Sequence, residues 1–453
     1  MKNTGILILI CFALMGISCK KMISVDPPKD QLTQDKIFSD SATANALMIN
    51  NYARLEQRIN PLLNRYLGVY SDELNATEIE QDYITSRIKT NNTRNYNTWT
   101  YTYQIIYQCN DFLEQLNKAI PLSTKLVKQL KGEASFLRAY CNFYLVNLYD
   151  NIPLLTVTDV NQTRRSPQSN TESVYRLILS DLLFAKENLE AGYIGTGRIR
   201  ANKWAAAALL ARVYLYQKQY VLAEKEASEV INCNLYTPLS AVGEIYKTGS
   251  REQILTLWTA KGFTTDGADF LPPKPGLNAK FLVTERLYNS FENNDLRKSD
   301  WIGTTTETVN GNTNTYHYIR KYKNNEAMTG LPEYLSVLRL SEQYLIRAEA
   351  RLEQNKITGA EGALSDLNII RTRAGLNNLT TADQTSVRAA VENERRHELV
   401  TEWGHRFFDL KRTGRLNTVM FAYKPTWQVS SGTFPVPQQE ITYNSNLRQN
   451  PGY

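Results

Sequence analysis

The sequence predicts an all-α fold: a scaffold of tetratricopeptide-like helical pairs with irregular loop insertions and a small β-hairpin. Three observations lead to this prediction. Apolar residues recur at three- and four-residue spacing through most of the chain. Two helical pairs repeat one pattern of small residues. Between them lies a stretch rich in Gly, Thr, Asn and Pro, where Asn310-Gly311 separates two polar Thr-rich segments, as in a type I′ hairpin.

The helical periodicity defines the elements in chain order. It predicts helices over residues 42–59, 100–119, 124–149, 171–190, 202–217, 220–232, 336–354, 358–373 and 384–412. Helical periodicity fades between Leu235 and Pro332. We therefore expect an N-terminal helical region at 41–234, an irregular region with the hairpin at 235–335, and a C-terminal helical region at 336–453.

The repeated small residues are alanines that flank a short turn. Ala211 and Ala223 are twelve residues apart, and so are Ala348 and Ala360. This spacing is typical of the positions where the two helices of a tetratricopeptide repeat cross closely, because a large side chain there would push the helices apart. The two copies are 137 residues apart rather than in tandem. The sequence therefore predicts an interrupted repeat array.

The first 18 residues have the three parts of a secretory signal peptide. Lys2 supplies the positive charge, residues 6–14 (ILILICFAL) supply the apolar core, and small residues precede Cys19. The apolar core is too short to span a bilayer. A cysteine in this position resembles the lipobox of bacterial lipoproteins, where it becomes the acylated first residue, although Gly16 replaces the usual Leu. The alternative is an ordinary signal peptide that is cut elsewhere.

We expect that residues 1–18 are removed and that residues 19–40 form a lipidated tether anchored through Cys19. Each methylene of an acyl chain adds roughly 0.8 kcal/mol when it is buried in a membrane, so several chains hold a protein firmly. No later segment approaches 18 consecutive apolar residues. We therefore expect that the mature chain does not cross the membrane.

The composition is that of a folded body, with 42% hydrophobic and 21% charged residues. The net charge is +7, but the basic residues are scattered among 45 acidic ones, which argues against nucleic acid as a partner. The 27 tyrosines suit wet binding surfaces as well as cores. Cys109, Cys141 and Cys233 lie in apolar helical patterns and are expected to be buried free thiols.

Catalytic signatures do not stand out in the sequence. It has no Gly-x-Ser-x-Gly elbow and no Walker A motif, and Gly195-Thr-Gly197 lacks the third glycine of a dinucleotide-binding loop. Nothing relates the three histidines to a catalytic triad. We therefore expect a protein that is not an enzyme and that needs no cofactor.

One segment invites a metal-site interpretation. Glu398, Glu402 and His405 recur on one face of the predicted helix 384–412 and are residue types that ligate zinc. However, Thr401 occupies the place of the second histidine of a zincin motif. Glu402 and Arg406 have the spacing of a favourable helical ion pair. We therefore expect an ion-paired structural helix and no metal.

Five aromatic residues are candidates for ligand contact. Trp99 lies just before the predicted helix 100–119, in a polar run (NNTRNYNTWTYTY) that also contains Tyr101, and Trp301, Tyr316 and Tyr318 lie in or beside the hairpin region. Aromatic rings on loops beside Asn, Thr and Arg form a platform on which a sugar ring can stack. The alternative for each of them is a position in the core.

Several ordered segments together resemble the SusD/RagB family of nutrient-uptake lipoproteins of the Bacteroidetes outer membrane. The resemblance runs from Cys19 to Tyr453. Its most specific segments are residues 137–140 (LRAY), 143–149 (FYLVNLY), 339–349 (RLSEQYLIRAE), 367–375 (LNIIRTRAG), 394–396 (ERR), 434–437 (FPVP) and 449–453 (QNPGY).

The resemblance implies a lid-like binding protein over a SusC-like TonB-dependent outer-membrane transporter, which captures glycans or peptides for import. It also implies that the Arg/Glu/His cluster near the C-terminus belongs to the scaffold, and that Trp99 occupies a context like one that supplies a stacking aromatic in starch-binding members. The Tyr and Trp content favours an oligosaccharide over a peptide as ligand. A scaffold protein for outer-membrane assembly and a surface hydrolase are the alternatives.

The resemblance further implies a lipid-anchored protein that faces the cell surface. Surface-destined lipoproteins of these bacteria often carry acidic residues after the cysteine, whereas Lys20 and Lys21 follow Cys19 here. This departure leaves an anchor that faces the periplasm as the alternative.

Overall fold

The computed structural model describes residues 38–453, apart from residues 77, 119–120, 275 and 327–329. The expected signal peptide, the expected lipidation site Cys19 and most of the expected tether lie outside the described residues. None of the helices in the described part is long and apolar enough to cross a membrane.

The helices and strands of the described chain follow in this order: α3 (Ser41–Arg54), η2 (Leu55–Ile59), η3 (Pro61–Tyr66), α4 (Leu67–Tyr70), β1 (Leu74–Ala76), α5 (Gln81–Ile84), α6 (Thr93–Gln115), α7 (Thr124–Tyr149), β2 (Ile152–Pro153), α8 (Val160–Thr163), β3 (Gln168–Ser169), α9 (Thr171–Asn188), α10 (Lys203–Tyr216), α11 (Tyr220–Asn232), η4 (Val242–Glu244), β4 (Gln253–Leu257), α12 (Thr265–Phe270), β5 (Phe281–Val283), α13 (Glu285–Tyr288), α14 (Leu296–Trp301), β6 (Ile302–Val309), β7 (Asn312–Ile319), β8 (Leu335–Arg339), α15 (Leu340–Glu353), α16 (Ala363–Arg373), α17 (Gln384–Glu398), α18 (His405–Arg412), α19 (Leu416–Tyr423), η5 (Val429–Gly432) and α20 (Gln438–Tyr443).

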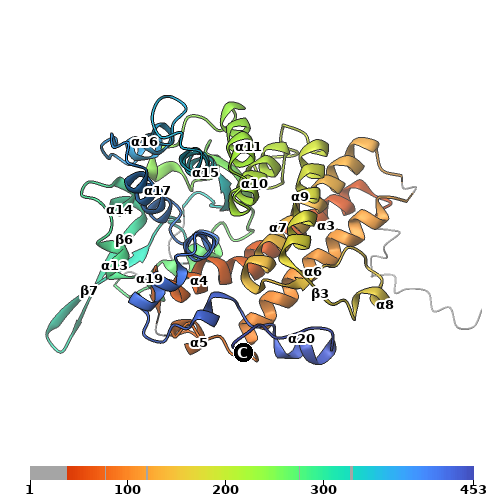
Figure 1. The fold of residues 1–453 in the computed structure, drawn as a ribbon, viewed down its shortest axis with the longest axis horizontal. Coiled ribbons are helices and arrows are strands. Elements are labelled where there is room, and N and C mark those ends of the chain that lie inside the picture. The colour runs from red at the N-terminus through yellow and green to blue at the C-terminus, as the bar shows by residue number, and fades with distance from the viewer. Residues whose placement is uncertain (1–37, 77, 119–120, 275, 327–329) are drawn as a thin grey trace, which may run out of the picture.

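Helices form the scaffold, as the sequence predicts, and each packs on the next (Figure 1). Helix α6 contacts α7, α7 contacts α9, and the series continues through α10 and α11 to α15, which also contacts α16 and α17. Helix α7 lies at the centre, since most of its residues are buried on every side. A helix that is buried all round belongs to the core rather than to the surface.

Side-chain caps fix where the long helices begin. Ser123 starts α7 by accepting a hydrogen bond from the backbone N–H of Leu126 (3.3 Å). Asn170 and Asn202 start α9 and α10 in the same way. Each cap satisfies a backbone donor that has no partner within its helix, which stabilises the helix by about 1 kcal/mol. These polar residues are the reason that the predicted and observed starts of α7 and α9 agree.

The alanine pattern is confirmed in one repeat and corrected in the other. Ala211 on α10 and Ala223 on α11 are both fully buried. Ala348 on α15 is fully buried as well, but Ala360 is exposed in the turn that precedes α16. The buried small residue of α16 is instead Ala363. The second turn is longer than the sequence pattern implied, which moves the close approach of the helices by three residues.

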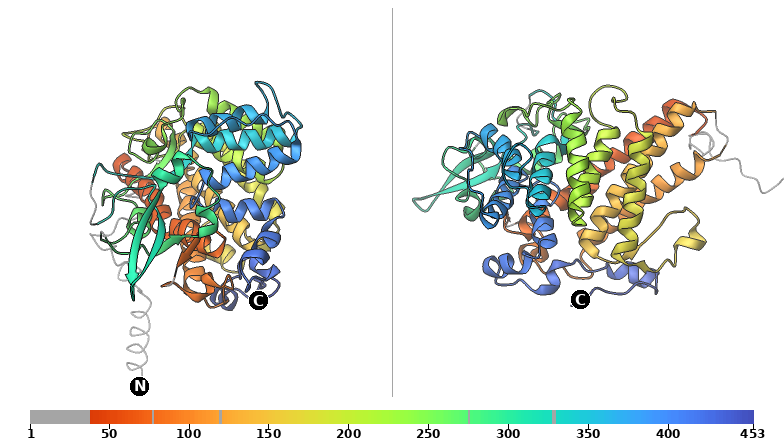
Figure 2. Two further views of the ribbon diagram at one scale, coloured as in Figure 1. Left: turned by 90° about the vertical axis from the view of Figure 1, so that its left-hand side faces the viewer. Right: turned by 45° about the horizontal axis from the view of Figure 1, so that its top comes forward.

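Within the described residues the strands form four two-stranded sheets, of which β6–β7 is the predicted hairpin. Asn310 and Gly311 at its tip have φ values of 53° and 80°. Both values are positive, as a type I′ turn requires. The hairpin projects from one end of the molecule (Figures 1 and 2). The other sheets join segments distant in sequence, such as β1 with β5 and β4 with β8.

The predicted helix 384–412 is broken in the structure. Helix α17 ends at Glu398 and α18 begins at His405, and between them Thr401, Trp403 and Gly404 all have positive φ values. A backbone in this region cannot continue a right-handed helix. Tertiary contacts hold the break, because the Trp403 indole N–H donates to the carbonyl of Ser336 (2.7 Å).

The break also changes the predicted ion pairs. Glu402 binds Arg339 (2.9 Å) and Lys321 (2.5 Å) on other elements rather than Arg406. Arg406 binds Asp72 (2.8 Å). The prediction that this segment is an ion-paired part of the scaffold is confirmed, although its expected helical pair is wrong. Buried cations thus occupy carboxylates that the sequence offered as candidate metal ligands.

The three described cysteines are free. Cys109 and Cys141 are buried, as expected, and burial raises the pKa of both thiols. Cys233 is only partly buried. It follows α11 and donates its S–H to the carbonyl of Val230 (3.1 Å).

Candidate functional site

Trp99 and Trp301, which the sequence analysis placed on loops or beside the hairpin, are core residues on helices. Helix α6 begins at Thr93 instead of residue 100, so Trp99 lies within it and is only 2% exposed. Its ring packs edge-to-face on Tyr149, with 4.8 Å between the ring centroids. Trp301 ends α14, is fully buried, and donates its indole N–H to the carbonyl of Val242 (3.1 Å). Neither ring leaves a face open for a ligand.

Tyr316 and Tyr318 are placed on β7 of the hairpin and are both partly buried. They are two residues apart on one strand, so their side chains lie on the same face. The ring of Tyr318 covers Gly303 on the paired strand, where an added Cβ would lie 2.2 Å from the Tyr318 Cζ. The hairpin projects away from α6 (Figures 1 and 2), so these tyrosines are not grouped with Tyr101.

Tyr101 is the candidate that combines partial exposure with a polar neighbour. It lies on α6, and the Arg58 guanidinium carbon is 4.8 Å from its ring centroid. Arg58 is exposed and, among the described residues, forms no ion pair. It belongs to η2, the first of two successive π-helical segments, η2 and η3. Such π-helical turns are rare in proteins and are frequently found at functional sites.

A loop from the irregular region lies against η2. The backbone N–H of Thr265 donates to the carboxylate of Glu56 (2.8 Å), which holds the start of α12 on the N-terminal helices. The preceding loop carries Trp258, which is 42% exposed, and Phe263, over whose ring Lys261 places its ammonium 5.6 Å from the centroid. The aromatic rings of this loop therefore lie on a segment that is fixed to the π-helical turns.

Lys261 lies close enough to Glu56 for its charge to affect the pKa of that carboxyl group. Burial raises the pKa of Glu56, and the hydrogen bonds from Thr265 and the charges of Arg65 and Lys261 oppose this rise. Glu56 is 3% exposed and so lies beneath the surface. Like Arg58, Lys261 has no ion pair among the described residues. Two cations therefore remain available for a ligand in this region.

A second loop extends the apolar part of the region. The backbone N–H of Glu333 donates to the carbonyl of Gly262 (3.0 Å), and the side-chain amide of Asn324 donates to the carbonyl of Leu331 (2.6 Å). These bonds fix the segment around Leu331 beside the loop of Trp258. Leu331 is 84% exposed, which is high for a large apolar side chain.

We call the residues Arg58, Tyr101, Trp258, Lys261 and Phe263 the aromatic face. Its rings offer flat apolar surfaces and its cations offer hydrogen-bond donors. This combination of aromatic surface with a few polar groups is typical of small-molecule binding sites.

Among these residues, the sequence analysis found only Tyr101. Trp258 was missed because it follows the apolar strand β4, where a tryptophan looks like one more core residue. The signal that could have found it is its position at the end of that strand, directly before the polar Thr-Ala-Lys-Gly run. Arg58 and Phe263 had no separate signal, because only the fold brings η2 to the loop.

Solved structures share this fold. A SusD-like protein from Bacteroides fragilis superposes with a TM-score of 0.79 at 22% identity, over 94% of this chain and all of that chain. A structure described as a laminarin binding SusD-like protein gives a TM-score of 0.75 at 23% identity, over 92% of this chain and all of the other. At these identities the likeness establishes the fold.

Sequence relatives have the same character. The chain is 25% identical over 415 residues to SusD-like protein P25 of Formosa agariphila, which covers 77% of each protein. It is 33% identical over 134 residues to the starch-binding protein SusD of Bacteroides thetaiotaomicron, which covers 26% of this chain and 21% of that protein.

Two family matches cover most of the chain. Residues 24–215 match the family described as starch-binding and associating with the outer membrane, and residues 255–453 match the family described as the SusD family. The two matches are in the expected order, and the fold and the relatives agree with them. The chain therefore belongs to the SusD/RagB family.

Proposed function

We propose that this protein captures an oligosaccharide on its aromatic face and delivers it to a SusC-like TonB-dependent transporter in the outer membrane. The observation that carries the proposal is the pairing of partly exposed aromatic rings with cations that form no ion pair with described residues, on two segments held together by the bond from Thr265 to Glu56. Membership of a family with starch-binding members and a laminarin-binding neighbour supports a glycan as the ligand. Binding of a peptide instead of an oligosaccharide is the other possible result of the binding experiment.

The binding experiment compares two rings of the aromatic face, Trp258, which is exposed, and Tyr101, which is partly buried. Isothermal titration calorimetry with starch and laminarin oligosaccharides measures the affinity of the wild-type protein, Trp258→Ala and Tyr101→Ala. Tyr443→Ala is the control, because Tyr443 is 75% exposed on α20 and lies outside the aromatic face. Loss of a stacking ring removes about 1 kcal/mol or more. We expect at least a fivefold loss of affinity for Trp258→Ala and Tyr101→Ala and no change for the control.

The same titrations also test whether the ligand is an oligosaccharide or a peptide. A peptide library that binds in place of both glycans, with the same dependence on Trp258, would replace oligosaccharide by peptide. Equal affinity of all variants for every ligand would reject the aromatic face as the site. Turnover of a captured glycan or peptide by the purified protein would show instead that the protein is a hydrolase.

Tyr316 and Tyr318 are proposed as a second contact on the hairpin. Their shared face is separate from the aromatic face, so Tyr316→Ala tests it independently. We expect reduced affinity for long oligosaccharides and unchanged affinity for short ones, because only a long ligand reaches a second contact. Unchanged affinity for both lengths would remove the two tyrosines from the site.

The anchor and the transporter are proposed from the N-terminal sequence and the family. We expect that Cys19→Ala releases the protein from the outer membrane, as measured by fractionation and by mass spectrometry of the N-terminus. We expect that the wild-type protein co-purifies with a TonB-dependent barrel from solubilised membranes. Absence of any associated barrel would favour the alternative of a scaffold protein. Surface protease accessibility of intact cells decides between the cell surface and the periplasmic face.

A further inference from the structure

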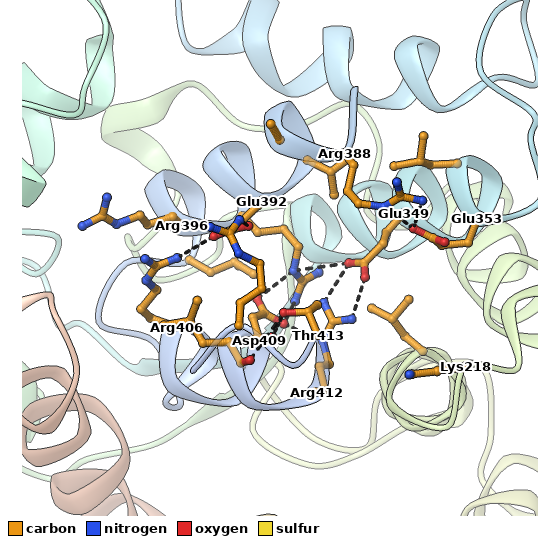
Figure 3. A pocket seen from close by; sticks show the side chains of 18 of the residues that line it. Lys218, Glu349, Glu353, Arg388, Glu392, Arg396, Arg406, Asp409, Arg412 and Thr413 are labelled. Carbon is orange, nitrogen blue, oxygen red and sulfur yellow. Dashed lines mark hydrogen bonds and ion pairs between the residues drawn. The ribbon is translucent and has the colours of Figure 1, made fainter. Parts of the chain in front are cut away.

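A cavity of about 480 Å³ lies between α15, α17 and α18, beside the turn from α10 to α11 (Figure 3). Its volume is within the range of small-molecule sites, about 300–1,000 Å³. Seven Lys and Arg residues line it, against five Asp and Glu residues. The aromatic face described above contributes none of them.

The floor of the cavity is neutral. Asp409 accepts hydrogen bonds from the Nε atoms of Arg395 and Arg412, both at 2.8 Å. Arg412 also binds both oxygens of Glu349, at 2.6 and 2.7 Å. Two guanidinium groups are thus matched by two carboxylates. However, Arg395 is 2% exposed and its Nη1 has no hydrogen-bond partner among the described residues, which leaves a buried donor in need of an acceptor.

One side of the cavity carries a lysine that forms no ion pair with a described residue. Arg388 binds Glu353 at 2.9 Å. Lys218, at the turn between α10 and α11, lines the cavity as well, and it forms no ion pair with any described residue. Both Lys218 and Arg388 are accessible to solvent, so an incoming ligand can reach them without unfolding the site. Two cations here are opposed by one carboxylate.

The opposite side carries a network of arginines and acids. Glu392 accepts from Arg406 (3.3 Å) and from Arg415. Arg406 is shared with Asp72 (2.8 Å), which in turn binds Arg396 (3.0 Å). Three arginines on this side therefore face these two carboxylates and the carboxyl of Glu73, whose pKa burial raises to about 7. Burial, together with the nearby charge of Arg406, lowers the pKa of Arg396.

The remaining wall is apolar. Leu215, Leu352 and Val391 line the cavity between the charged sides. An inorganic ion alone would leave these surfaces without contact, whereas the carbon skeleton of an organic molecule would cover them. Guanidinium groups bind oxyanions through paired, charge-assisted hydrogen bonds. The apolar wall therefore favours an organic molecule, and the guanidinium groups favour an anion.

We propose that this cavity binds a small organic anion, such as a sugar acid, with its oxyanion group held by Lys218 and Arg388. The ligand places its carbon skeleton against Leu215, Leu352 and Val391. This is a second binding site, distinct from the aromatic face and independent of the proposed glycan capture. The carboxylate of a free sugar acid and that of an acidic residue within a glycan share this chemistry.

The test is calorimetric titration of the detergent-solubilised full-length lipoprotein with sodium glucuronate and, at the same ionic strength, with glucose. We expect that glucuronate binds and that glucose does not. Lys218→Gln and Arg388→Gln should each weaken glucuronate binding by about tenfold or more, as loss of a charge-assisted bond implies. Lys225→Gln, an exposed lysine on α11 that does not line the cavity, is the matched control and should not change it.

The outcomes separate this proposal from its alternatives. Glucuronate affinity that is unchanged in Lys218→Gln and Arg388→Gln, or equal to that of glucose, would overturn it. If an acidic oligosaccharide binds and its affinity depends on Lys218 rather than on Trp258, the carboxylate that the cavity binds comes from an acidic residue within a glycan rather than from a free sugar acid. Because Trp258→Ala leaves this cavity intact, failure of the aromatic face and failure of the cavity are distinguishable.

Discussion

The guanidinium of Arg212 on α10 binds the carboxylate of Glu342 on α15 through two contacts of 2.7 Å, from Nε to Oε1 and from Nη2 to Oε2. Their side chains are 1% and 2% exposed. The remaining Arg212 Nη1 donates to the hydroxyl of Tyr144 on α7 (3.0 Å). One buried ion pair therefore joins three helices that are far apart in sequence, and it connects the two repeat pairs.

Removal of the acid from this pair should destabilise the fold strongly. Glu342→Gln leaves the buried charge of Arg212 without its counter-ion, so we expect the free energy of unfolding to fall by about 3–5 kcal/mol. Urea denaturation measures this. Glu172→Gln is the control, because the pair of Glu172 with Arg176 is 77% and 64% exposed and should contribute at most about 0.5 kcal/mol. Equal losses in the free energy of unfolding for Glu342→Gln and Glu172→Gln would contradict the stabilising role of the buried ion pair.

The break between α17 and α18 predicts a contrast between two glycines. Gly404 has a φ of 69°, and an added Cβ would lie 2.6 Å from Leu67 Cδ1. Gly414 has a similar φ of 73° but nothing within 4 Å. Both Ala variants carry backbone strain of about 1–3 kcal/mol, and only Gly404→Ala adds an overpacking cost of about 1–3 kcal/mol. In thermal denaturation, Gly404→Ala should therefore have a clearly lower melting temperature than Gly414→Ala. The reverse order would exclude the close packing of Gly404 against Leu67.

The buried carboxyl of Glu73 predicts a pH dependence of stability. Burial raises its pKa to about 7, against the hydrogen bond from the backbone N–H of Thr401. The folded protein therefore binds a proton more tightly than the unfolded chain. The resulting stability is present below about pH 4.5 and is lost as the pH rises through 7. Asp266 has its pKa raised to about 7 by burial as well and adds to this slope.

Glu73→Gln isolates the contribution of one group, because glutamine keeps an acceptor for Thr401 and does not ionise. We expect the stability of the variant relative to the wild type to increase by on the order of 2 kcal/mol between pH 4.5 and pH 7.5. Urea midpoints of both proteins across this range give the difference. Parallel stability curves for the two proteins would show that Glu73 does not titrate in this window.

The two classes of tryptophan predict opposite phenotypes. Trp99→Ala removes a core ring that packs on Tyr149 and should lower the free energy of unfolding by about 3–5 kcal/mol. Trp258→Ala, at a residue 42% exposed, should change it by about 0.5 kcal/mol or less. Urea denaturation of both variants, alongside the glycan titrations, separates a structural role from a binding role. A stable Trp99→Ala protein would restore Trp99 as a candidate contact.

The sequence predicted the long helices well where periodicity and caps coincide. Helix α7 was predicted at its observed bounds because an apolar pattern begins directly after the cap residue Ser123. Helix α6 was predicted to begin seven residues too late, because its first turns consist of polar residues that carry no apolar periodicity. This error placed Trp99 on a loop, and its burial follows from packing on Tyr149, which no local pattern encodes.

The candidate site was predicted less well than the fold. Tyr101 was found because it stands in an aromatic-rich polar run, but its partner Arg58 is 43 residues earlier and meets it only through the packing of η2 on α6. The prediction that Glu402 pairs with Arg406 failed for a related reason. The contacts of Trp403 with distant segments interrupt the helix on which that spacing depends.

The sequence by itself determined the all-α class, the order of the helices, the hairpin turn at Asn310-Gly311 and the family. The first three features depend on local periodicity, caps and turn chemistry, which act over a few residues. The family follows from the resemblance of its ordered segments. The tertiary structure decided which tryptophans are buried, where the helix 384–412 breaks, and which cations remain unpaired around the aromatic face and the cavity. Burial and ion pairing depend on contacts between segments hundreds of residues apart, and only the folded chain brings those segments together.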